Sequence, residues 1–225
     1  MGDAVLVISG HPDDETLGCG GTLLRHHARG DRVFWLIVTK TYAPQWSHEV
    51  VAVKAAEVEA VATVYGFERH FNLGLPSARL DTVPEADLIS GIRDVIGLTE
   101  PTTVYVVHSG DAHTDHQRVH RATMSVLKSF YMTKFGVGRI LAYETVSSTD
   151  VATPHVTTAF LPNVFIDITP YIDRKLEIME RYRSEAQVEP LPRSASAIRA
   201  LARYRGAIVG VQYAEAFMLI REVTR

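Results

Sequence analysis

The sequence near the N-terminus reads Ala4-Val-Leu-Val-Ile-Ser9 and continues as Gly10-His11-Pro12-Asp13-Asp14-Glu15. The first part is apolar almost throughout, as expected of a strand covered on both faces of a sheet. The second part is polar, and a helical pattern then runs from Glu15 to Arg29, with Gly30-Asp31 as its stop. A buried strand that passes directly into a helix is typical of the start of a parallel α/β sheet.

The same alternation continues through the first two thirds of the chain. It predicts a Rossmann-like α/β fold, in which a mainly parallel sheet carries helices on both faces, and a single domain over residues 1–225. Further strands are expected at 33–38, near Phe71, and at 103–107, 140–143 and 164–168, and helices from Ser47 to Gly66, over 84–96 and 115–131, and from Thr169-Pro170 onward.

Composition narrows the classes of function. The 225 residues include 23 Lys and Arg and 26 Asp and Glu, so we expect no electrostatic partnership with nucleic acid or an anionic membrane. No stretch approaches the roughly 18 apolar residues of a membrane span, and the N-terminus lacks a signal-peptide pattern, which makes the cytoplasm the expected location. The single cysteine, Cys19, excludes an internal disulfide and a thiolate zinc site.

Histidine is the unusual feature of this composition, because four of the ten histidines lie between residues 108 and 120. His11 and three acids follow the first strand, and His108-Ser-Gly-Asp-Ala-His113-Thr-Asp-His116 follows the strand at 103–107. Parallel strands bring their carboxyl ends to one edge of the sheet, where α/β folds bind ligands. We therefore expect these two loops to meet.

Where the loops meet, they offer His11, Asp14 and His116 as metal ligands. Two imidazoles, one carboxylate and an open position make a catalytic zinc site rather than a closed structural one. Iron(II) is the alternative ion, since it accepts the same donors. A polar helix N-terminus would explain Asp14 and Glu15 through the helix macrodipole, but it would leave His11 unexplained.

The side chains beside these ligands suggest catalytic roles. Adjacent side chains point in different directions, so one of Asp13 and Asp14 is expected to bind the metal while the other faces a metal-bound water as a base. His113 is expected beside the metal, where Asp115 is close enough to hold its tautomer or raise its pKa.

The pair of motifs His11-Pro-Asp-Asp-Glu15 and His113-Thr-Asp-His116 resembles that of the PIG-L (LmbE-like) zinc deacetylases. This family removes acetyl groups from N-acetylglucosaminyl conjugates. The likeness extends over nearly the whole chain, with further similar stretches at Tyr143-Glu144, Ser147-Ser-Thr149, Pro162-Asn163, Asp167-Ile168, Pro192-Arg193-Ser194, Arg205-Gly206 and Tyr213-Ala-Glu-Ala-Phe217.

The resemblance implies a zinc-dependent N-deacetylase acting on a small-molecule amino-sugar conjugate, and a homo-oligomer, as bacterial members often are. Asp13 matches the family's general base. His113 matches the histidine that stabilises the tetrahedral intermediate and protonates the leaving amine, with Asp115 as its partner. The family's zinc ligands are matched by His11, Asp14 and His116.

Three further residues are candidates for substrate contact. Lys54 stands roughly where relatives have a substrate-holding Arg, and it keeps the charge but loses the planar fork of a guanidinium. Arg139, before the strand at 140–143, is a candidate oxyanion or substrate contact, or else a solvated charge at the start of a strand. Trp46 is a candidate sugar-stacking face or a hydrophobic lid contact. Leu191 departs from the His that many relatives carry before Pro-Arg-Ser.

The sequence leaves two alternative functions open, and it leaves the roles of two segments to be decided by the structure. The same centre would serve an amidase of a larger thiol–sugar conjugate, and a sugar- or nucleotide-binding module could hold Mg²⁺ on the same acids without catalysis. Residues 184–197 are predicted to be a loop, either a flap over the site or a surface connection. Gly18-Cys19-Gly20-Gly21 lacks the third glycine of a nucleotide-binding loop, since Leu23 stands there, and predicts close helix–sheet packing instead.

Overall fold

The apolar strand predicted near the N-terminus lies inside a sheet in the computed structural model, which describes residues 2–153 and 155–224. Every residue of this strand is buried. Within the described residues the sheet has seven strands in the order β3-β2-β1-β4-β5-β7-β6. The strands are β1 (Ala4–Ser9), β2 (Arg32–Lys40), β3 (Arg69–Pro76), β4 (Thr103–Val107), β5 (Arg139–Tyr143), β6 (Val164–Asp167) and β7 (Ala214–Glu222).

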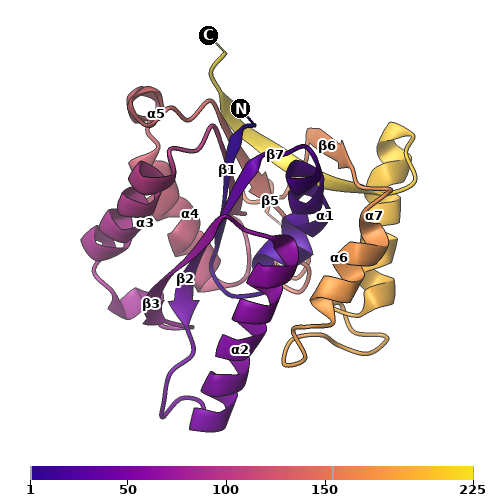
Figure 1. Cartoon of the computed structure of the whole chain (residues 1–225), viewed down its shortest axis with the longest axis horizontal. Helices are drawn as coiled ribbons and strands as arrows, with labels where there is room; N and C mark the ends of the chain where they lie inside the picture. The colour runs from indigo at the N-terminus through magenta and orange to yellow at the C-terminus, as the bar shows by residue number, and fades with distance from the viewer. Residues whose placement is uncertain (1, 154, 225) are drawn as a thin grey trace.

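The predicted Rossmann-like α/β architecture is confirmed. The five strands β1 to β5 pair in parallel, and β7 is antiparallel to both β5 and β6. Helices α3 and α4 cover one face of the sheet, while α1, α2, α6 and α7 cover the other (Figure 1). The helices are α1 (Asp14–Ala28), α2 (His48–Tyr65), the short 3₁₀ helix η1 (Leu80–Thr82), α3 (Glu85–Thr99), α4 (Thr114–Val126), α5 (Ser129–Phe135), α6 (Ile172–Met179) and α7 (Ala195–Val209).

Local signals place the ends of α2 where the sequence predicts them. The Ser47 Oγ accepts a hydrogen bond from the Val50 amide at 3.2 Å and so caps the first turn. Gly66 ends the helix with φ 67°, a left-handed conformation that glycine adopts without steric cost. No helix in the described part of the chain combines the length and apolar character needed to cross a membrane.

The predicted helix over 115–131 is wrong in one respect, because it is two helices. The first ends at Val126, and Lys128 is extended before α5 begins. Leu127 between them is fully buried, and its carbonyl accepts a hydrogen bond from Arg221 of β7 at 3.2 Å. The Leu127 carbonyl thus bonds to a strand nearly a hundred residues away instead of to an amide of a continuing helix. The local sequence contains no signal that predicts this contact.

The C-terminal third also differs from the prediction. The helix expected at Thr169-Pro170 begins only at Ile172, because the Thr169 hydroxyl donates to Asp167 Oδ1 at 2.6 Å instead of capping the helix. Helix α7 and strand β7 have no predicted counterpart. The strand β7 inserts between β5 and β6 and ties the end of the chain into the sheet.

The glycines of α1 pack closely, as predicted. A Cβ at Gly18 would lie 2.1 Å from the ring of Tyr143, and one at Gly21 would lie 2.7 Å from the Cβ of Ile168. The helix is kinked between them at Cys19, whose φ of −142° is not helical. This approach brings the N-terminal end of α1, which carries Asp13 and Asp14, close against the sheet.

Candidate metal centre and active site

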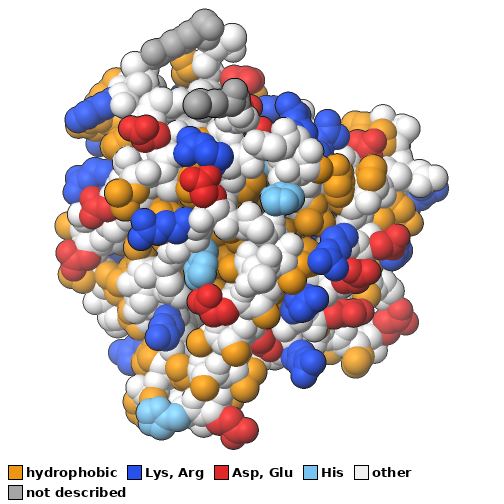
Figure 2. All heavy atoms as spheres, in the orientation of Figure 1, with side chains coloured by type: hydrophobic (Ala, Val, Ile, Leu, Met, Phe, Trp, Pro, Cys, Tyr) orange, Lys and Arg blue, Asp and Glu red, His pale blue; other side chains and the backbone are white. Residues whose placement is uncertain are grey.

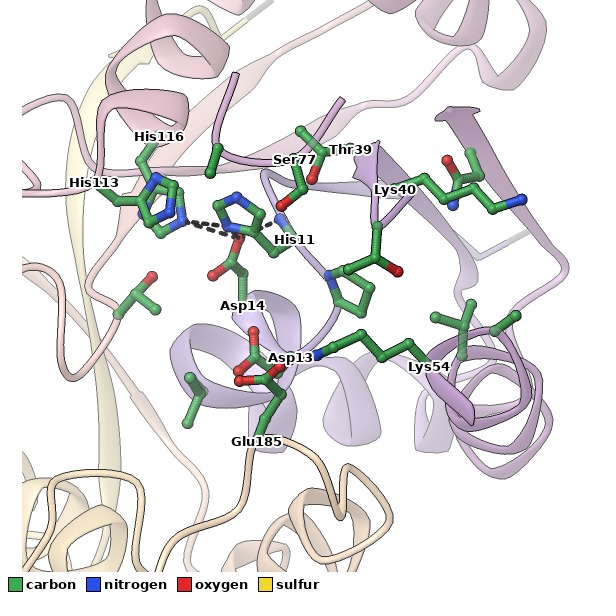
Figure 3. A pocket seen from close by; sticks show the side chains of 18 of the residues that line it. His11, Asp13, Asp14, Thr39, Lys40, Lys54, Ser77, His113, His116 and Glu185 are labelled. Atoms are coloured by element: carbon green, nitrogen blue, oxygen red, sulfur yellow. Dashed lines mark hydrogen bonds and ion pairs between the residues drawn. The ribbon is translucent and has the colours of Figure 1, made fainter. Parts of the chain in front are cut away.

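The two polar loops meet as predicted, because β1 and β4 are parallel neighbours with Ile8 opposite Val106. Their carboxyl ends therefore lie side by side at one edge of the sheet. Figure 3 shows His11 and Asp14 from the first loop facing His116 from the second. His116 and Asp14 are almost completely buried, so their polar atoms face one another rather than solvent.

Three atoms converge at the spacing of metal ligands. His11 Nδ1 lies 3.2 Å from His116 Nε2 and 3.7 Å from Asp14 Oδ2, and the last two atoms lie 3.2 Å apart. Ligand bonds of about 2.0–2.1 Å at tetrahedral angles place zinc ligands about 3.3 Å from one another. The ring nitrogens of His11, His113 and His116 also fall within 4.8 Å, but this is a looser set. The set that includes Asp14 fits a tetrahedral ion better.

The outer nitrogen of each histidine ligand candidate is held by a carboxylate. Asp115 Oδ2 lies 2.9 Å from His11 Nε2, and Asp111 Oδ2 lies 2.8 Å from His116 Nδ1. Asp115 also accepts the amide of Ala78 at 2.7 Å. Such carboxylate–imidazole pairs fix the ring orientation and the tautomer of metal-binding histidines. They direct His11 Nδ1 and His116 Nε2 toward the shared point.

The electrostatics of this cluster suit a cation. Burial would raise the pKa of Asp14, but the charges and hydrogen bonds of His116 and His11 lower it to about 2. Burial would lower the pKa of His116, but Asp14 and Asp111 raise it to about 10. The cluster therefore holds positive charge strongly at the point where the three ligand atoms converge, which a metal cation would supply in place of a proton.

Asp13 faces away from this cluster. Its backbone has φ 96°, in the left-handed region, which turns its side chain away from that of Asp14 (Figure 3). Burial raises the pKa of Asp13 well above its usual range, and the carboxylates of Asp14 and Glu185 raise it further, while Arg193 opposes them. A carboxylate that binds a proton this readily has the property required of a general base.

His113 lies beside the metal-ligand candidates, with its ring centroid 4.3 Å from that of His11. Its Nδ1 accepts the backbone amide of Asp115 at 3.2 Å, so its proton belongs on Nε2. Burial, together with the charges of His11 and His116, lowers the pKa of His113 to about 4. Asp115 acts on His113 as expected, since its charge raises the pKa of His113 and its backbone amide fixes the tautomer, but its carboxylate forms a hydrogen bond with His11 across the two loops rather than with His113.

A cavity of about 540 Å³ opens beside these residues. One of its walls is largely apolar and comes from α2 and the loop before it. Strands β2 and β3 supply a polar wall at their carboxyl ends. Val50 and Val53 of α2 are 36% and 45% exposed, and Figure 2 shows hydrophobic atoms at the surface over this helix. The apolar wall includes Trp46, Val51, Ala55 and Val58. The polar wall includes Thr39, Thr41, Asn72 and Ser77.

Comparison with known proteins identifies the family to which a chain with this arrangement belongs. The PIG-L family model, described as GlcNAc-PI de-N-acetylase, matches residues 6–127, which include both histidine loops and more than half of the chain. The chain belongs to the PIG-L family. Among its relatives, the uncharacterized deacetylase YaiS of Escherichia coli (strain K12) is 26% identical over 186 residues, covering 80% of this chain and 90% of YaiS.

Solved structures show that this fold is not confined to proteins named as deacetylases. The conserved protein TT1542 from Thermus thermophilus is similar with a TM-score of 0.75 and 29% identity, covering 99% of this chain and 97% of TT1542. GalB, the 4-carboxy-2-hydroxymuconate hydratase from Pseudomonas putida KT2440, is similar with a TM-score of 0.73 and 18% identity, covering 100% and 99%. The function therefore has to be inferred from the residues of the site and not from the fold alone.

Two of the three predicted substrate contacts line the cavity of this PIG-L member, namely Lys54 and Trp46. Arg139 does not lie at the site. It is the first residue of β5, and in a parallel sheet the first residue of a strand lies at the edge opposite the carboxyl ends. Its guanidinium lies 3.9 Å from Glu222, so the alternative interpretation, a charge at the start of a strand, describes it better.

The structure brings to the site three residues for which the sequence pattern predicts no role: Asp111, Glu185 and Arg193. Asp111 stands in the second histidine loop, where nothing in the motif spacing marks it as the partner of His116. Glu185 and Arg193 come from the predicted loop at 184–197, which forms a wall of the cavity. Lys54 forms an ion pair with Glu185 (Figure 3). Their roles depend on contacts between distant segments, which motif spacing does not show.

Proposed function

We propose that this PIG-L member is a zinc-dependent N-deacetylase that releases acetate from an N-acetylglucosaminyl or related amino-sugar conjugate. The observation that carries the proposal is the convergence of His11, Asp14 and His116 at zinc-ligand spacing, with Asp13 and His113 on the adjoining cavity wall. The description of the family as a de-N-acetylase and the name of YaiS support the reaction class.

When bound by His11, Asp14 and His116, zinc would polarise the amide carbonyl and lower the pKa of water toward neutrality. Asp13 takes a proton from the water whose oxygen bonds to the carbonyl carbon. As the carbon–nitrogen bond breaks, Asp13 returns that proton to the departing nitrogen. Acetic acid and a free amine are then the products, which ionise to acetate and an ammonium ion near pH 7, and Asp13 is again a carboxylate.

His113 has a narrower role than the family resemblance implies. With a pKa near 4 it is neutral at pH 7, and its Nδ1 is occupied as an acceptor. A neutral imidazole with its proton on Nε2 donates a hydrogen bond to a developing oxyanion. We therefore propose His113 first as the oxyanion donor, and as an acid only when the bound substrate raises its pKa.

The donor set argues against one of the two alternatives and leaves the other to substrate tests. A magnesium-binding module without catalysis would use oxygen ligands and waters, whereas two imidazole nitrogens at ligand spacing favour zinc or iron(II). An amidase of a larger thiol–sugar conjugate would use the same centre, and only the acceptance of substrates separates it from the deacetylase.

Metal analysis of the purified protein, combined with acetate release from a panel of N-acetylglucosamine conjugates, tests the proposal. We expect bound zinc and acetate from at least one conjugate. Asp13→Ala is expected to keep the zinc and lose about 10²- to 10⁴-fold in turnover, while Asp81→Asn, at an exposed position, serves as the control. Zinc without acetate from any conjugate would reject the substrate, and magnesium in place of zinc would reject the centre.

A further inference from the structure

The segment over 182–193 joins α6 to α7 and runs past the N-terminal end of α1. Its residues contact the first motif at two points, the carboxylate of Glu15 and the carboxylate of Asp13. The segment is also fastened to α2, because Ser184 donates from its amide and its hydroxyl to Glu57, at 3.0 and 2.7 Å. It is therefore a fixed wall of the cavity with ties to two helices.

The backbone of Asp13 is held in an unfavourable conformation. A φ of 96° is rare for a residue with a side chain and persists only where surrounding contacts determine it. The Asp13 amide donates to Glu15 Oε2 at 3.2 Å, and the other oxygen of this buried carboxylate accepts the Tyr182 hydroxyl at 2.8 Å. Tyr182 thus supports, through Glu15, the turn that sets the direction of the Asp13 side chain.

The carboxylate of Asp13 is approached by a chain of alternating charges. Arg193 Nη1 lies 3.6 Å from Asp13 Oδ2 and 3.0 Å from Glu185 Oε2. Glu185 is in turn paired with Lys54 of α2, which also donates to Ser184 Oγ at 3.1 Å. Arg193 therefore has a fixed anion on one side and the proposed base on the other.

We propose that Arg193 is a positioning residue that orients the Asp13 carboxylate, and that Glu185 holds the Arg193 guanidinium in place. This inference rests on the proposed role of Asp13 as the general base. Reaction geometry requires the base within hydrogen-bond distance of the attacking water, and a displacement of about 1 Å costs on the order of 100-fold in rate. A guanidinium beside Asp13 limits the rotamers that its carboxylate can adopt.

Arg193 could alternatively bind the substrate itself. Its Nε is buried and has no hydrogen-bond partner among the residues that the structure describes, so it could donate to a bound ligand. The two roles predict different kinetics. Loss of a positioning residue lowers kcat with little change in KM, whereas loss of a contact made equally in ground and transition states raises KM and leaves kcat unchanged.

The test compares Arg193→Ala, Arg193→Lys and Glu185→Gln with Arg199→Ala, an arginine of α7 paired with the exposed Asp173. We expect Arg193→Ala to lower kcat about 10- to 100-fold with KM changed less than about threefold, and Arg193→Lys and Glu185→Gln to lower kcat less. Methylguanidine added to the Arg193→Ala protein should restore part of kcat, but it should not affect Arg199→Ala or Asp13→Ala. A raised KM with unchanged kcat, or unchanged kinetics, would overturn the proposal.

Crystal structures of wild type, Arg193→Ala and Arg199→Ala give a readout that needs no substrate. The Asp13 carboxylate is expected to be ordered in one rotamer in wild type and Arg199→Ala and to occupy several in Arg193→Ala, with the same metal content in all three. A single unchanged rotamer in Arg193→Ala would contradict the inference. If no conjugate is deacetylated but the rotamers change, the proposed function fails while the positioning contact stands.

Discussion

The carboxyl groups of the three consecutive acids in the first motif have different pKa values because each lies in a different environment. The pKa of Asp13 is raised by burial, that of Asp14 is lowered to about 2 by two histidines that overcome its burial, and that of Glu15 is raised to about 7 by burial. These differences follow from the partner that each carboxylate meets. Asp14 faces imidazoles, whereas the carboxylate of Glu15 meets hydroxyl and amide donors without a positive charge.

Glu15 gives a residue-level prediction about stability. Its usual pKa of 4.5 rises to about 7 in the fold, so the folded state binds a proton more tightly than the unfolded chain does. The stability that this proton confers is complete below pH 4.5 and is lost as the pH rises to 7, by about 3 kcal/mol. Glu15→Gln, a mimic of the protonated form, should lack this loss. Urea unfolding of both proteins between pH 4.5 and 8 measures it.

An exposed glutamate provides the control for this experiment. Glu49→Gln changes the same functional group at an exposed position of α2, and its unfolding free energy should follow the wild-type pH dependence. Since all other titrating groups are shared, the difference between wild type and Glu15→Gln isolates Glu15. Parallel curves for these two proteins would contradict the raised pKa.

Site residues could be predicted where their role depends on the strand that precedes them. His11 and His116 follow buried strands, and parallel pairing brings such loops together whatever the details of packing. Asp115 shows the limit of this reasoning. The family resemblance pairs it with His113, two residues earlier, but its carboxylate binds His11, because the meeting of two loops decides which imidazole lies within reach. Arg193 reaches Asp13 from the other end of the chain, and no spacing rule connects them.

At the scale of secondary structure, the kink in α1 is stabilised by two buried charges from elsewhere. The break at Cys19 frees backbone groups on both sides of it. Lys175 of α6 donates to the Leu17 carbonyl at 2.8 Å, and Glu215 of β7 accepts the amides of Gly21 and Thr22 at 2.9 and 2.7 Å. The same two side chains form an ion pair of 2.7 Å. The C-terminal elements thus complete the helix whose N-terminal end carries the proposed base, Asp13, and the metal-ligand candidate Asp14.

This arrangement predicts an asymmetric response to mutation. Lys175→Met would leave the Glu215 carboxylate buried without its cation, at an expected cost of about 3–5 kcal/mol in the free energy of unfolding. Adding Glu215→Gln removes the buried charge and keeps an acceptor oxygen for one of the two amides, so the double variant should be more stable than Lys175→Met. Urea unfolding measures both, with the exposed Lys134→Met as control. A double variant less stable than the single one would contradict this account.

Helices and strands could be predicted where the local sequence contains signals for their ends, such as a capping residue or a terminating glycine. Helix α2 begins at a capping Ser47 and ends at Gly66, and both are readable locally. The division of α4 from α5 depends on Arg221 and the insertion of β7 depends on pairing with β5, so both require knowledge of tertiary contacts. Tertiary packing overrides local preference at these places.

At the scale of the whole molecule, the cavity is assembled from segments that span most of the chain. Residues near 11–17, 39–59, 70–78, 113–116, 145–148 and 185–193 all contribute to its lining. The first four segments come from carboxyl ends of parallel strands and the helices after them, which is why the alternating pattern locates the site. The last two lie beyond the part of the chain matched by the family model.

A metal that joins the two histidine loops should stabilise the entire fold. His11 and Asp14 precede α1 or begin it, whereas His116 lies on α4 on the other face of the sheet, so an ion bound by all three links both layers of helices. An ion that binds only the folded state at 100 times its Kd adds about 2.7 kcal/mol. For a chain of this size that amounts to roughly 5–10 °C in Tm.

Calorimetry with and without a chelator, followed by addition of zinc, measures this linkage. Chelation is expected to lower the Tm of wild type, and zinc should restore it. His116→Ala should have a lower Tm that no longer responds to zinc, because only two of the three ligands remain. His48→Ala changes an exposed histidine at the start of α2 and should respond as wild type does. A His116→Ala protein with the full zinc response would show that the stabilising ion binds elsewhere, for instance on surface histidines, and would remove His116 from the ligand set.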